Sequence, residues 1–290
     1  MSVVGESYLV GLIGEGVLPS LTPPLHEAEA DAQGLRYLYR PLDLPSIGRR
    51  PDELGLLLSE AQGLGFTAVN ITHPCKREAM RHLDEADASA ASVGAANTVL
   101  FRNGRRIGHN TDVTGFAAAL HDGLPGADLA RVAIVGAGGA GAAVACALLE
   151  AGAGRVTLLD IESGPAEALA GRLRPRFPGV ALSGASVSAV DGVLADATGV
   201  VNASFVGMHS HPGVPFDPAL LHPGLWVADV VYRPLDTELL RAARLRGCRT
   251  LDGGVMAVGQ AADAFRLITG LEPDRARMRA HFTSMIERGL

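Results

Sequence analysis

The chain contains very little lysine. Lys76 is its only one, and all the other basic residues among its 25 lysines and arginines are arginine. A guanidinium keeps its proton in a protein, whereas an ε-ammonium can lose it when burial or a neighbouring charge shifts its pKa. A lysine kept in an arginine-rich chain is therefore a candidate for proton transfer, with a chance surface lysine as the alternative.

Cysteine and runs of positive charge are also scarce. The three cysteines, Cys75, Cys146 and Cys248, form no CxxC pair, which favours reduced thiols and a cytoplasmic protein. The net charge is −6 and no arginine run is long enough to form a basic stripe, so we expect no nucleic-acid partner. The first residues, Met1–Glu6, lack the basic start and apolar core of a signal peptide.

One uncharged apolar stretch, residues 132–149, has the hydropathy of a membrane span. Four glycines, Gly136, Gly138, Gly139 and Gly141, interrupt it near its beginning. A short strand that leads into the start of a helix explains this pattern better than a continuous helix does. We therefore expect no membrane segment.

Apolar runs and helical patterns alternate along the 290 residues, which is typical of an α/β fold with two domains. The pattern restarts after Asp112, and the last two helices have no strand between them. This predicts a first domain over 1–112, a second over 113–254, and C-terminal helices over 255–290 that return to the first domain.

The expected strands and helices follow from this alternation. Strands are predicted at Tyr8–Ile13, Leu35–Tyr39, Ala68–Ile71, Arg131–Val135, Arg155–Asp160, Gly199–Asn202 and Trp226–Val230. Helices are predicted at Pro24–Gln33 with Thr22 as N-cap, Asp52–Gln62, Lys76–Leu83, Glu85–Ser92, Val113–Leu120, Pro165–Arg174, Thr237–Leu245, Val255–Thr269 and Pro273–Arg288. The Asn103-Gly104 pair predicts a hairpin between Thr98–Arg102 and Arg106–His109.

A glycine-rich motif follows the strand predicted at Arg131–Val135. Gly136, Gly138 and Gly141 form the pattern G-x-G-x-x-G, which includes Ala137 and Gly139 and opens a helix. Asp160 closes the next strand, where a carboxylate accepts hydrogen bonds from the ribose hydroxyls of NAD and repels a 2′-phosphate. The sequence therefore predicts a Rossmann-type site for NAD rather than NADP, with a glycine-rich turn of no function as the alternative.

Several further motifs resemble the shikimate/quinate dehydrogenase family. Residues Asn70 to Lys76 match its N-x-T-x-P-x-K segment, and the chain also carries the runs Gly94–Thr98 (G-A-x-N-T) and Gly108–Asp112 (G-x-N-T-D). Downstream, Asn202–Ser204 with Gly207-Met208, Asp229–Pro234 and Met256–Gln260 resemble its nicotinamide-lining segment, its D-x-x-Y-x-P run and its final glutamine helix. The resemblance covers nearly the whole chain in order.

Oxidation of a secondary alcohol needs a group that takes the hydroxyl proton while hydride leaves for the dinucleotide. We expect Lys76 and Asp112 to form this proton-transfer pair, with a structural ion pair as the alternative. The resemblance implies that Thr72, Asn97 and Gln260 surround the substrate and that Ser20, Thr22 and Tyr232 hold its carboxylate. It also implies cofactor contacts for Asn202, Met208 and Gly253. Helix capping by Ser20 and Thr22, packing by Tyr232 and a solvent-facing Gln260 are the competing interpretations.

Two departures from the family pattern bear on substrate and cofactor. Thr22 stands where the biosynthetic members usually have a second serine, and together with Asp160 it resembles the NAD-linked quinate/shikimate branch. Cys75 and Phe205 replace residues that are commonly a bulky aromatic and a proline or small residue, which leaves substrate choice open. The His209-Ser210-His211 run lacks acidic or cysteine partners, so we expect no metal site.

The sequence thus predicts an α/β enzyme with an N-terminal substrate domain completed by C-terminal helices and an inserted Rossmann-type domain. Its expected activity is the reversible, NAD-dependent oxidation of a ring hydroxyl of shikimate or quinate, a small cyclic hydroxy acid. An aminated analogue as substrate and a non-catalytic dinucleotide-binding regulator are the alternatives. A homodimer and a monomer both fit the sequence.

Overall fold

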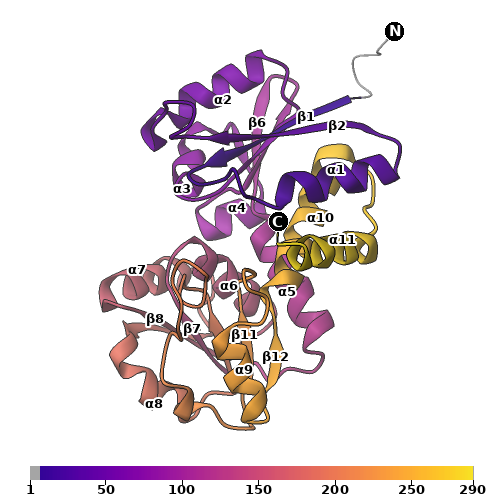
Figure 1. Cartoon of the computed structure of the whole chain (residues 1–290). Coiled ribbons are helices and arrows are strands. Elements are labelled where there is room, and N and C mark those ends of the chain that lie inside the picture. Colours follow the sequence, from indigo (N-terminus) through magenta and orange to yellow (C-terminus); the bar gives the residue numbers. More distant parts are fainter. Residues whose placement is uncertain (1–6, 290) are drawn as a thin grey trace. The chain divides into compact units, whose positions relative to one another are not determined.

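The computed structural model describes residues 7–289, so the segment on which the signal-peptide expectation rests lies outside them. The chain forms two compact units, one of Met1–Thr111 with Val258–Leu290 and one of Asp112–Ala257 (Figure 1). The chain passes from one unit to the other within two helices, α5 (Thr111–Gly123) and α10 (Gly253–Thr269).

The first unit is built on a mixed six-stranded sheet. Its strands are β1 (Ser7–Gly14), β2 (Arg36–Asp43), β3 (Ala68–Ile71), β4 (Glu85–Ala86), β5 (Thr98–Arg102) and β6 (Arg105–His109), in the order β2-β1-β3-β5-β6-β4. The first three are parallel, whereas β5 is antiparallel to both β3 and β6. Asn103 and Gly104, both with positive φ, form the predicted turn of the β5–β6 hairpin, which is confirmed.

Helices cover both faces of this sheet. On one face, α2 (Leu54–Gly63), α3 (Lys76–Ala79) and α4 (Ala88–Val93) pack on Ile13, Val69 and Ile71. On the other, α1 (Thr22–Ala32) and α10 lie together, because the ring of His26 contacts both Tyr39 and Phe265. Two short 3₁₀ segments, η1 (Pro51–Glu53) and η2 (Met80–His82), adjoin α2 and α3.

The C-terminal helix α11 (Arg275–Glu287) is tied to α1 by a buried carboxylate. Arg277 donates to both oxygens of Glu29 at 2.7 and 2.8 Å, and the backbone N–H of Asp274 donates to Glu29 as well. These bonds outweigh burial, which by itself would raise the pKa of Glu29, and hold that pKa below its usual value. In Figure 1, α11 and α10, at the yellow end of the chain, lie beside α1.

The second unit is built on a six-stranded parallel sheet. Its strands are β7 (Arg131–Val135), β8 (Arg155–Asp160), β9 (Ala181–Ser186), β10 (Gly199–Asn202), β11 (Trp226–Asp229) and β12 (Arg249–Leu251). The order β9-β8-β7-β10-β11-β12 is the Rossmann order, in which successive strands are added outwards on one side of β7 up to β9 and then on its other side from β10. The predicted fold class, two α/β domains of which the inserted one is Rossmann-type, is confirmed.

The helices of this unit are α6 (Gly139–Glu150), α7 (Ser163–Leu173), α8 (Val190–Leu194) and α9 (Glu238–Leu245), with η3 (Val187–Ala189) and η4 (Pro218–Leu220). Residues 132–149, whose hydropathy suggested a membrane span, form β7, the turn and α6, as predicted. In residues 7–289 no helix combines the length and apolarity that crossing a membrane would require.

Three local predictions were wrong. Leu21, not Thr22, is the N-cap residue of α1, and no side chain caps this helix; Pro23 and Pro24 in its first turn have no N–H to satisfy. Strand β2 continues past Tyr39 through Pro41, which an edge strand tolerates. The helix predicted from Glu85 begins only at Ala88, since Glu85–Ala86 pairs with β6 as β4.

Three further elements, β9, α8 and β12, were not predicted. Strand β9 has a single large apolar residue, Leu182, among small and polar ones, and the other two elements have only five and three residues. Segments this short carry too little hydrophobic periodicity to be recognised.

Candidate active site

Four chain segments meet at one edge of the first unit's sheet. Thr72 donates its backbone N–H to Ile13 at the end of β1, and Ile71 at the end of β3 donates to the Asn97 carbonyl. The Asn97 N–H in turn bonds to His109 at the end of β6. The carboxyl ends of β1, β3 and β6 and the beginning of β5 therefore lie together, and this edge carries Thr72 and Asn97.

Lys76 begins helix α3 directly beyond this edge. The chain turns after β3, where the Cys75 N–H bonds to the Thr72 carbonyl, and the Ala96 N–H bonds to the Lys76 carbonyl at 2.9 Å. These bonds place Lys76, which is half-buried, beside the segment that precedes Asn97. The structure thus brings Thr72, Lys76 and Asn97 together, although they lie on different chain segments.

The Asn97 carboxamide is buried and held by the residue before Asp112. Its Oδ1 accepts from the backbone N–H of Thr111 at 2.9 Å, and its Nδ2 donates to the Thr111 hydroxyl at 3.0 Å. Asp112 follows in the first turn of α5, is 7% exposed, and is the first residue of the second unit.

The remaining predicted substrate residues lie on other segments. Ser20 and Thr22 are half-buried in and after the loop that leaves β1, and the Thr22 N–H donates to Ser20 Oγ at 3.3 Å. Gln260 is half-buried on the part of α10 that belongs to the first unit. Tyr232 follows β11 in the second unit and is 37% exposed.

An aspartate–histidine pair supports the segment after β6, and sequence reasoning missed it. Asp87 accepts from His109 Nδ1 at 2.7 Å, from the Ala90 N–H and from the Ser89 hydroxyl. Burial alone would raise the pKa of Asp87, but these hydrogen bonds outweigh it and lower the pKa to about 2. Ser89 Oγ also accepts from the Asn110 N–H, so α4 fixes the segment that leads to Thr111. An aspartate at a helix N-cap was the available signal.

The glycine-rich turn of the second unit is shaped by close backbone approaches. Gly136 has φ of 105°, and a Cβ there would lie 2.8 Å from the Ala203 backbone. A Cβ on Gly141 would lie 1.9 Å from the Gly136 carbonyl oxygen. At Gly138 and Gly139, by contrast, a Cβ would meet no atom within 4 Å. Two glycines therefore permit packing, and the two between them leave the backbone accessible.

This turn fits a dinucleotide. Helix α6 begins at Gly139, and no side chain caps its N-terminus, so the positive end of its dipole meets the open space at Gly138 and Gly139. Asp160, at the end of β8, accepts from the Ala137 N–H and the Ile161 N–H, each at 2.8 Å. The predicted residues Gly136, Ala137, Gly138, Gly139, Gly141 and Asp160 are thus brought together.

Asn202 is fully buried and shapes the loop that leads to Met208. Its Nδ2 donates to the Val206 carbonyl and to Asp229, and its Oδ1 accepts from the N–H and the hydroxyl of Ser204. Met208 itself is 37% exposed. These bonds use both hydrogens and both lone pairs of the Asn202 amide, so this side chain acts on the loop.

Asp229, the first residue of the D-x-x-Y-x-P run, to which the sequence assigned no role of its own, links the ends of β10 and β11. It accepts from Asn202 Nδ2, from the Val231 N–H at 3.0 Å and from the Thr237 hydroxyl at 2.8 Å. Burial raises its pKa to about 6, and the three hydrogen bonds oppose this shift only in part. Next to it, Gly253 begins α10 so close to the Val231 carbonyl that a Cβ would lie 2.4 Å from the oxygen.

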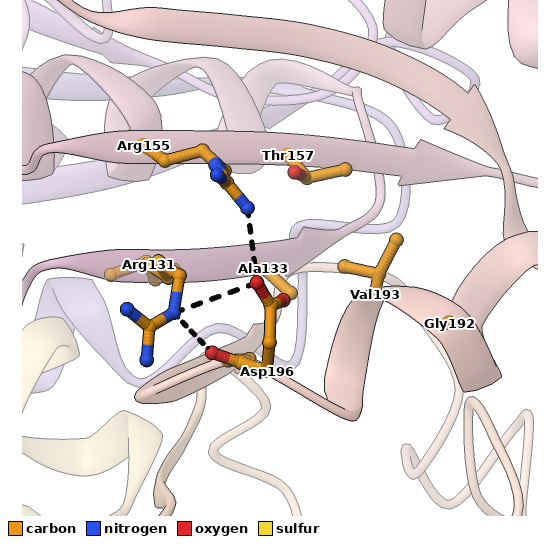
Figure 2. A pocket seen from close by; sticks show the side chains of 9 residues that line it. Arg131, Ala133, Arg155, Thr157, Gly192, Val193 and Asp196 are labelled. Atoms are coloured by element: carbon orange, nitrogen blue, oxygen red, sulfur yellow. Dashed lines mark hydrogen bonds and ion pairs between the residues drawn. The ribbon is translucent and has the colours of Figure 1, made fainter.

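A separate groove of about 240 Å³ lies at the opposite end of β7 and β8, between these strands and α8. Figure 2 shows Arg131 and Arg155, each the first residue of its strand, converging on Asp196. None of the predicted site residues lines this groove. Among the described residues there is also no group of three or more side chains that suits a metal ion.

Together, a glycine-rich turn on a Rossmann sheet and a lysine-bearing polar edge on a second α/β unit define a dinucleotide-dependent dehydrogenase. Comparisons with known proteins agree. The family model of the shikimate dehydrogenase substrate binding domain matches residues 12–99. Shikimate dehydrogenase (NADP(+)) of Pseudarthrobacter chlorophenolicus is 55% identical over 286 residues, which cover 99% of this chain and 98% of that protein.

A relative with the other cofactor name is also similar. Quinate/shikimate dehydrogenase (NAD(+)) of Corynebacterium efficiens is 48% identical over 281 residues, with 97% of this chain and 99% of the relative covered. Among solved structures, quinate dehydrogenase from Corynebacterium glutamicum in complex with NAD matches with a TM-score of 0.91 at 47% identity, covering 96% and 99% of the two chains. The chain belongs to the shikimate dehydrogenase family.

Proposed function

We propose that this protein oxidises a ring hydroxyl of shikimate or quinate to the 3-dehydro ketone, reversibly and with NAD as hydride acceptor. The observation that carries the proposal is the polar edge of the first unit, where Asn97 is locked by Thr111 beside the chain's only lysine. Full-length similarity to relatives named shikimate and quinate/shikimate dehydrogenase supports the same reaction.

Lys76 is the proposed general base. Its amine takes the proton of the reacting hydroxyl, and in the reverse direction its ammonium returns a proton to the ketone oxygen. Asp112 holds the ammonium in place and shares its proton. When bound, the dinucleotide supplies the hydride acceptor.

The other predicted residues orient the ring. Asn97, Thr72 and Gln260 hydrogen-bond the hydroxyls, and Ser20, Thr22 and Tyr232 donate hydroxyl hydrogens to the carboxylate. Ser20 suits this role because its oxygen already accepts from the Thr22 N–H, which leaves the hydroxyl hydrogen for donation. Such fixed contacts place the reacting carbon for hydride transfer.

NAD is proposed over NADP because of Asp160. Hydrogen bonds from Ala137 and Ile161 fix its carboxylate against the glycine-rich turn, where the adenosine ribose of a dinucleotide lies in Rossmann folds. The next residues are Ile161 and Glu162, so this segment offers no arginine to a 2′-phosphate. The names of the relatives are divided between NADP(+) and NAD(+), so the preference rests on this carboxylate.

Around the nicotinamide end, Met208 and Gly253 are the proposed contacts. Asn202 acts through the 203–208 loop, because its own amide is engaged within that loop and with Asp229.

The test is reduced-dinucleotide formation with shikimate and with quinate, each offered with NAD⁺ and with NADP⁺. Turnover with NAD⁺ supports the reaction and the role of Asp160, and the ratio of rates for the two acids assigns the branch. Turnover with NADP⁺ alone would contradict the cofactor proposal only. Absence of turnover with both acids, together with measurable dinucleotide binding, would favour an aminated substrate or a regulator.

A further inference from the structure

A line of buried polar side chains crosses the sheet of the first unit and ends at Asn97. Tyr39 on β2 donates its hydroxyl to Asn70 Oδ1 on β3 at 2.5 Å. Asn70 Nδ2 donates to the Thr98 hydroxyl on β5 at 2.8 Å, and that hydroxyl bonds to Asn97 Oδ1 at 3.1 Å. Thr111 closes the line at its far end.

Tyr39, Asn70 and Thr98 share one face of the sheet because of strand register. Asn70 pairs with Thr98 in the antiparallel β3–β5 ladder. Because Asn70 lies two residues after Ala68 in β3, both side chains are on the face that α1 and α10 cover. Tyr39, Asn70, Thr98 and Asn97 are each at most 5% exposed. Burying a polar group this deeply costs free energy unless the group is hydrogen-bonded. Because each group in the line bonds to the next, loss of one bond leaves a buried partner unsatisfied.

Backbone groups at both ends fix the direction of every bond. Asn70 Nδ2 also reaches the Asn97 carbonyl oxygen, which can only accept, so Asn70 must turn its oxygen towards Tyr39. The Thr111 N–H can only donate, so Asn97 must turn its Oδ1 towards it. Burial raises the pKa of Tyr39 well above its usual value, which keeps the hydroxyl protonated as a donor.

The consequence is a single orientation for the Asn97 carboxamide. Its Oδ1 accepts from both Thr111 and Thr98, and any ligand atom that meets its Nδ2 must be a hydrogen-bond acceptor. If the Thr98 hydroxyl were missing, one of the bonds that hold this orientation would be lost.

We propose that Tyr39, Asn70 and Thr98 are positioning residues that fix the Asn97 carboxamide for substrate binding. The proposal rests on the proposed function, in which Asn97 contacts a ring hydroxyl. It adds three residues that do not touch the substrate themselves and act through Asn97.

The first test compares Thr98→Val with Thr98→Ser. Valine keeps the branched shape and removes the hydroxyl, whereas serine keeps the hydroxyl and removes a methyl group. We expect Thr98→Val to raise KM for the ring acid about fivefold, the factor that one lost hydrogen bond of ordinary strength gives. Its kcat should change less, KM for the dinucleotide should not change, and Thr98→Ser should restore the KM for the acid.

The second test compares two tyrosines of the same strand. Tyr39→Phe removes the first donor of the line, and Tyr37→Phe removes a hydroxyl that bonds His26 instead. We expect a raised KM for the acid in Tyr39→Phe and a wild-type KM in Tyr37→Phe, even where both lower the melting temperature.

A measurement without substrate separates this proposal from the proposed function. Hydrogen exchange of the Asn97 side-chain amide, followed by NMR, should be at least about tenfold faster in Thr98→Val than in the wild type, because opening of the local structure exposes it. If the wild type oxidises neither acid, the proposed function fails, and the exchange rate alone decides the positioning role. Wild-type exchange in Thr98→Val, or a wild-type KM in both Thr98→Val and Tyr39→Phe, would overturn the proposal.

Discussion

The two units present their candidate sites by different means. In the first, Asn97, Thr72 and Lys76 offer side chains from three chain segments, and Thr111 and Thr98 lock one of them. In the second, the turn from Gly136 to Gly141 offers backbone, with open space at Gly138 and Gly139 and no capping side chain.

The difference reflects what each site must bind. A ring with several hydroxyls requires donors and acceptors at fixed positions, which only oriented side chains supply. A pyrophosphate requires N–H groups, a helix dipole and room for its oxygens, which backbone supplies. The first site is therefore sensitive to the loss of side-chain atoms, and the second to their addition.

The largest effect should come from Lys76→Ala. Loss of the proposed base should lower kcat about 10²- to 10⁴-fold, the usual contribution of a general base. Dinucleotide affinity should not change, because the glycine-rich turn belongs to the other unit. Steady-state kinetics and a fluorescence titration with NADH measure the two effects.

Arg77→Ala is the matched control, since it removes the exposed cation next to Lys76 on the same helix. It should retain wild-type turnover. A Lys76→Ala enzyme that keeps more than about a tenth of wild-type kcat would contradict the role of this amine.

Two hydrogen-bonded aspartates, the buried Asp229 and the half-buried Asp87, should give the units opposite pH dependence. Asp229 has a pKa of about 6, above its unfolded value, so its favourable contribution to stability is present below about pH 4 and is lost as the pH rises towards 6. Asp87 has a pKa of about 2, so its contribution is present above about pH 4 and is lost as the pH falls towards 2.

Urea unfolding of the wild type and Asp229→Asn between pH 4 and 7 measures the first contribution. Relative to the variant, the wild type should lose up to about 3 kcal/mol of unfolding free energy across this interval, as a shift of two pKa units implies. A difference that does not vary with pH would show that Asp229 does not titrate in this range.

Two glycines of the same turn should separate folding from binding. Gly141→Ala places a Cβ against the Gly136 carbonyl and should destabilise the protein by about 1–3 kcal/mol. Gly138→Ala meets open space with φ of −76°, so stability should hold while dinucleotide affinity falls about tenfold. Thermal unfolding and dinucleotide titration of both variants measure this, and similar behaviour of the two would contradict a backbone-built site.

The smallest effect should be a change of cofactor preference in Asp160→Asn. Removal of this charge should shift the NADP⁺/NAD⁺ ratio of kcat/KM towards NADP⁺ by about threefold to tenfold, because repulsion of a 2′-phosphate is relieved. Asp191→Asn, an equal charge change at an exposed position of α8, should leave the ratio unaltered. An unaltered ratio in Asp160→Asn as well would refute the assignment of this carboxylate.

The contrast between the units also explains what the sequence could predict. The glycine-rich turn and the Asn103-Gly104 hairpin were recognisable because their backbone requirements are local and depend on a few neighbouring residues. Lys76 was recognisable from composition alone. The Rossmann domain followed from the alternation of strands and helices around that turn.

The line that supports Asn97 could not be predicted in this way. Tyr39 and Asn70 are 31 residues apart in the chain. They meet only because the sheet order β2-β1-β3 leaves a single strand, β1, between their strands. That order, and the register that aligns Asn70 with Thr98, depend on long-range packing. A polar residue within a buried four-residue strand was the one local sign, and it did not identify the partners.

The position of Lys76, half-buried at the start of α3, has a practical consequence. No other side chain in the protein carries a primary amine. An amine-selective acylating reagent therefore has one side-chain target, and protection of that target by a bound acid would report occupancy of the site directly in a mass spectrum. A protease that cleaves after lysine would likewise cut the denatured chain once, at this residue, and an acylated molecule would stay whole.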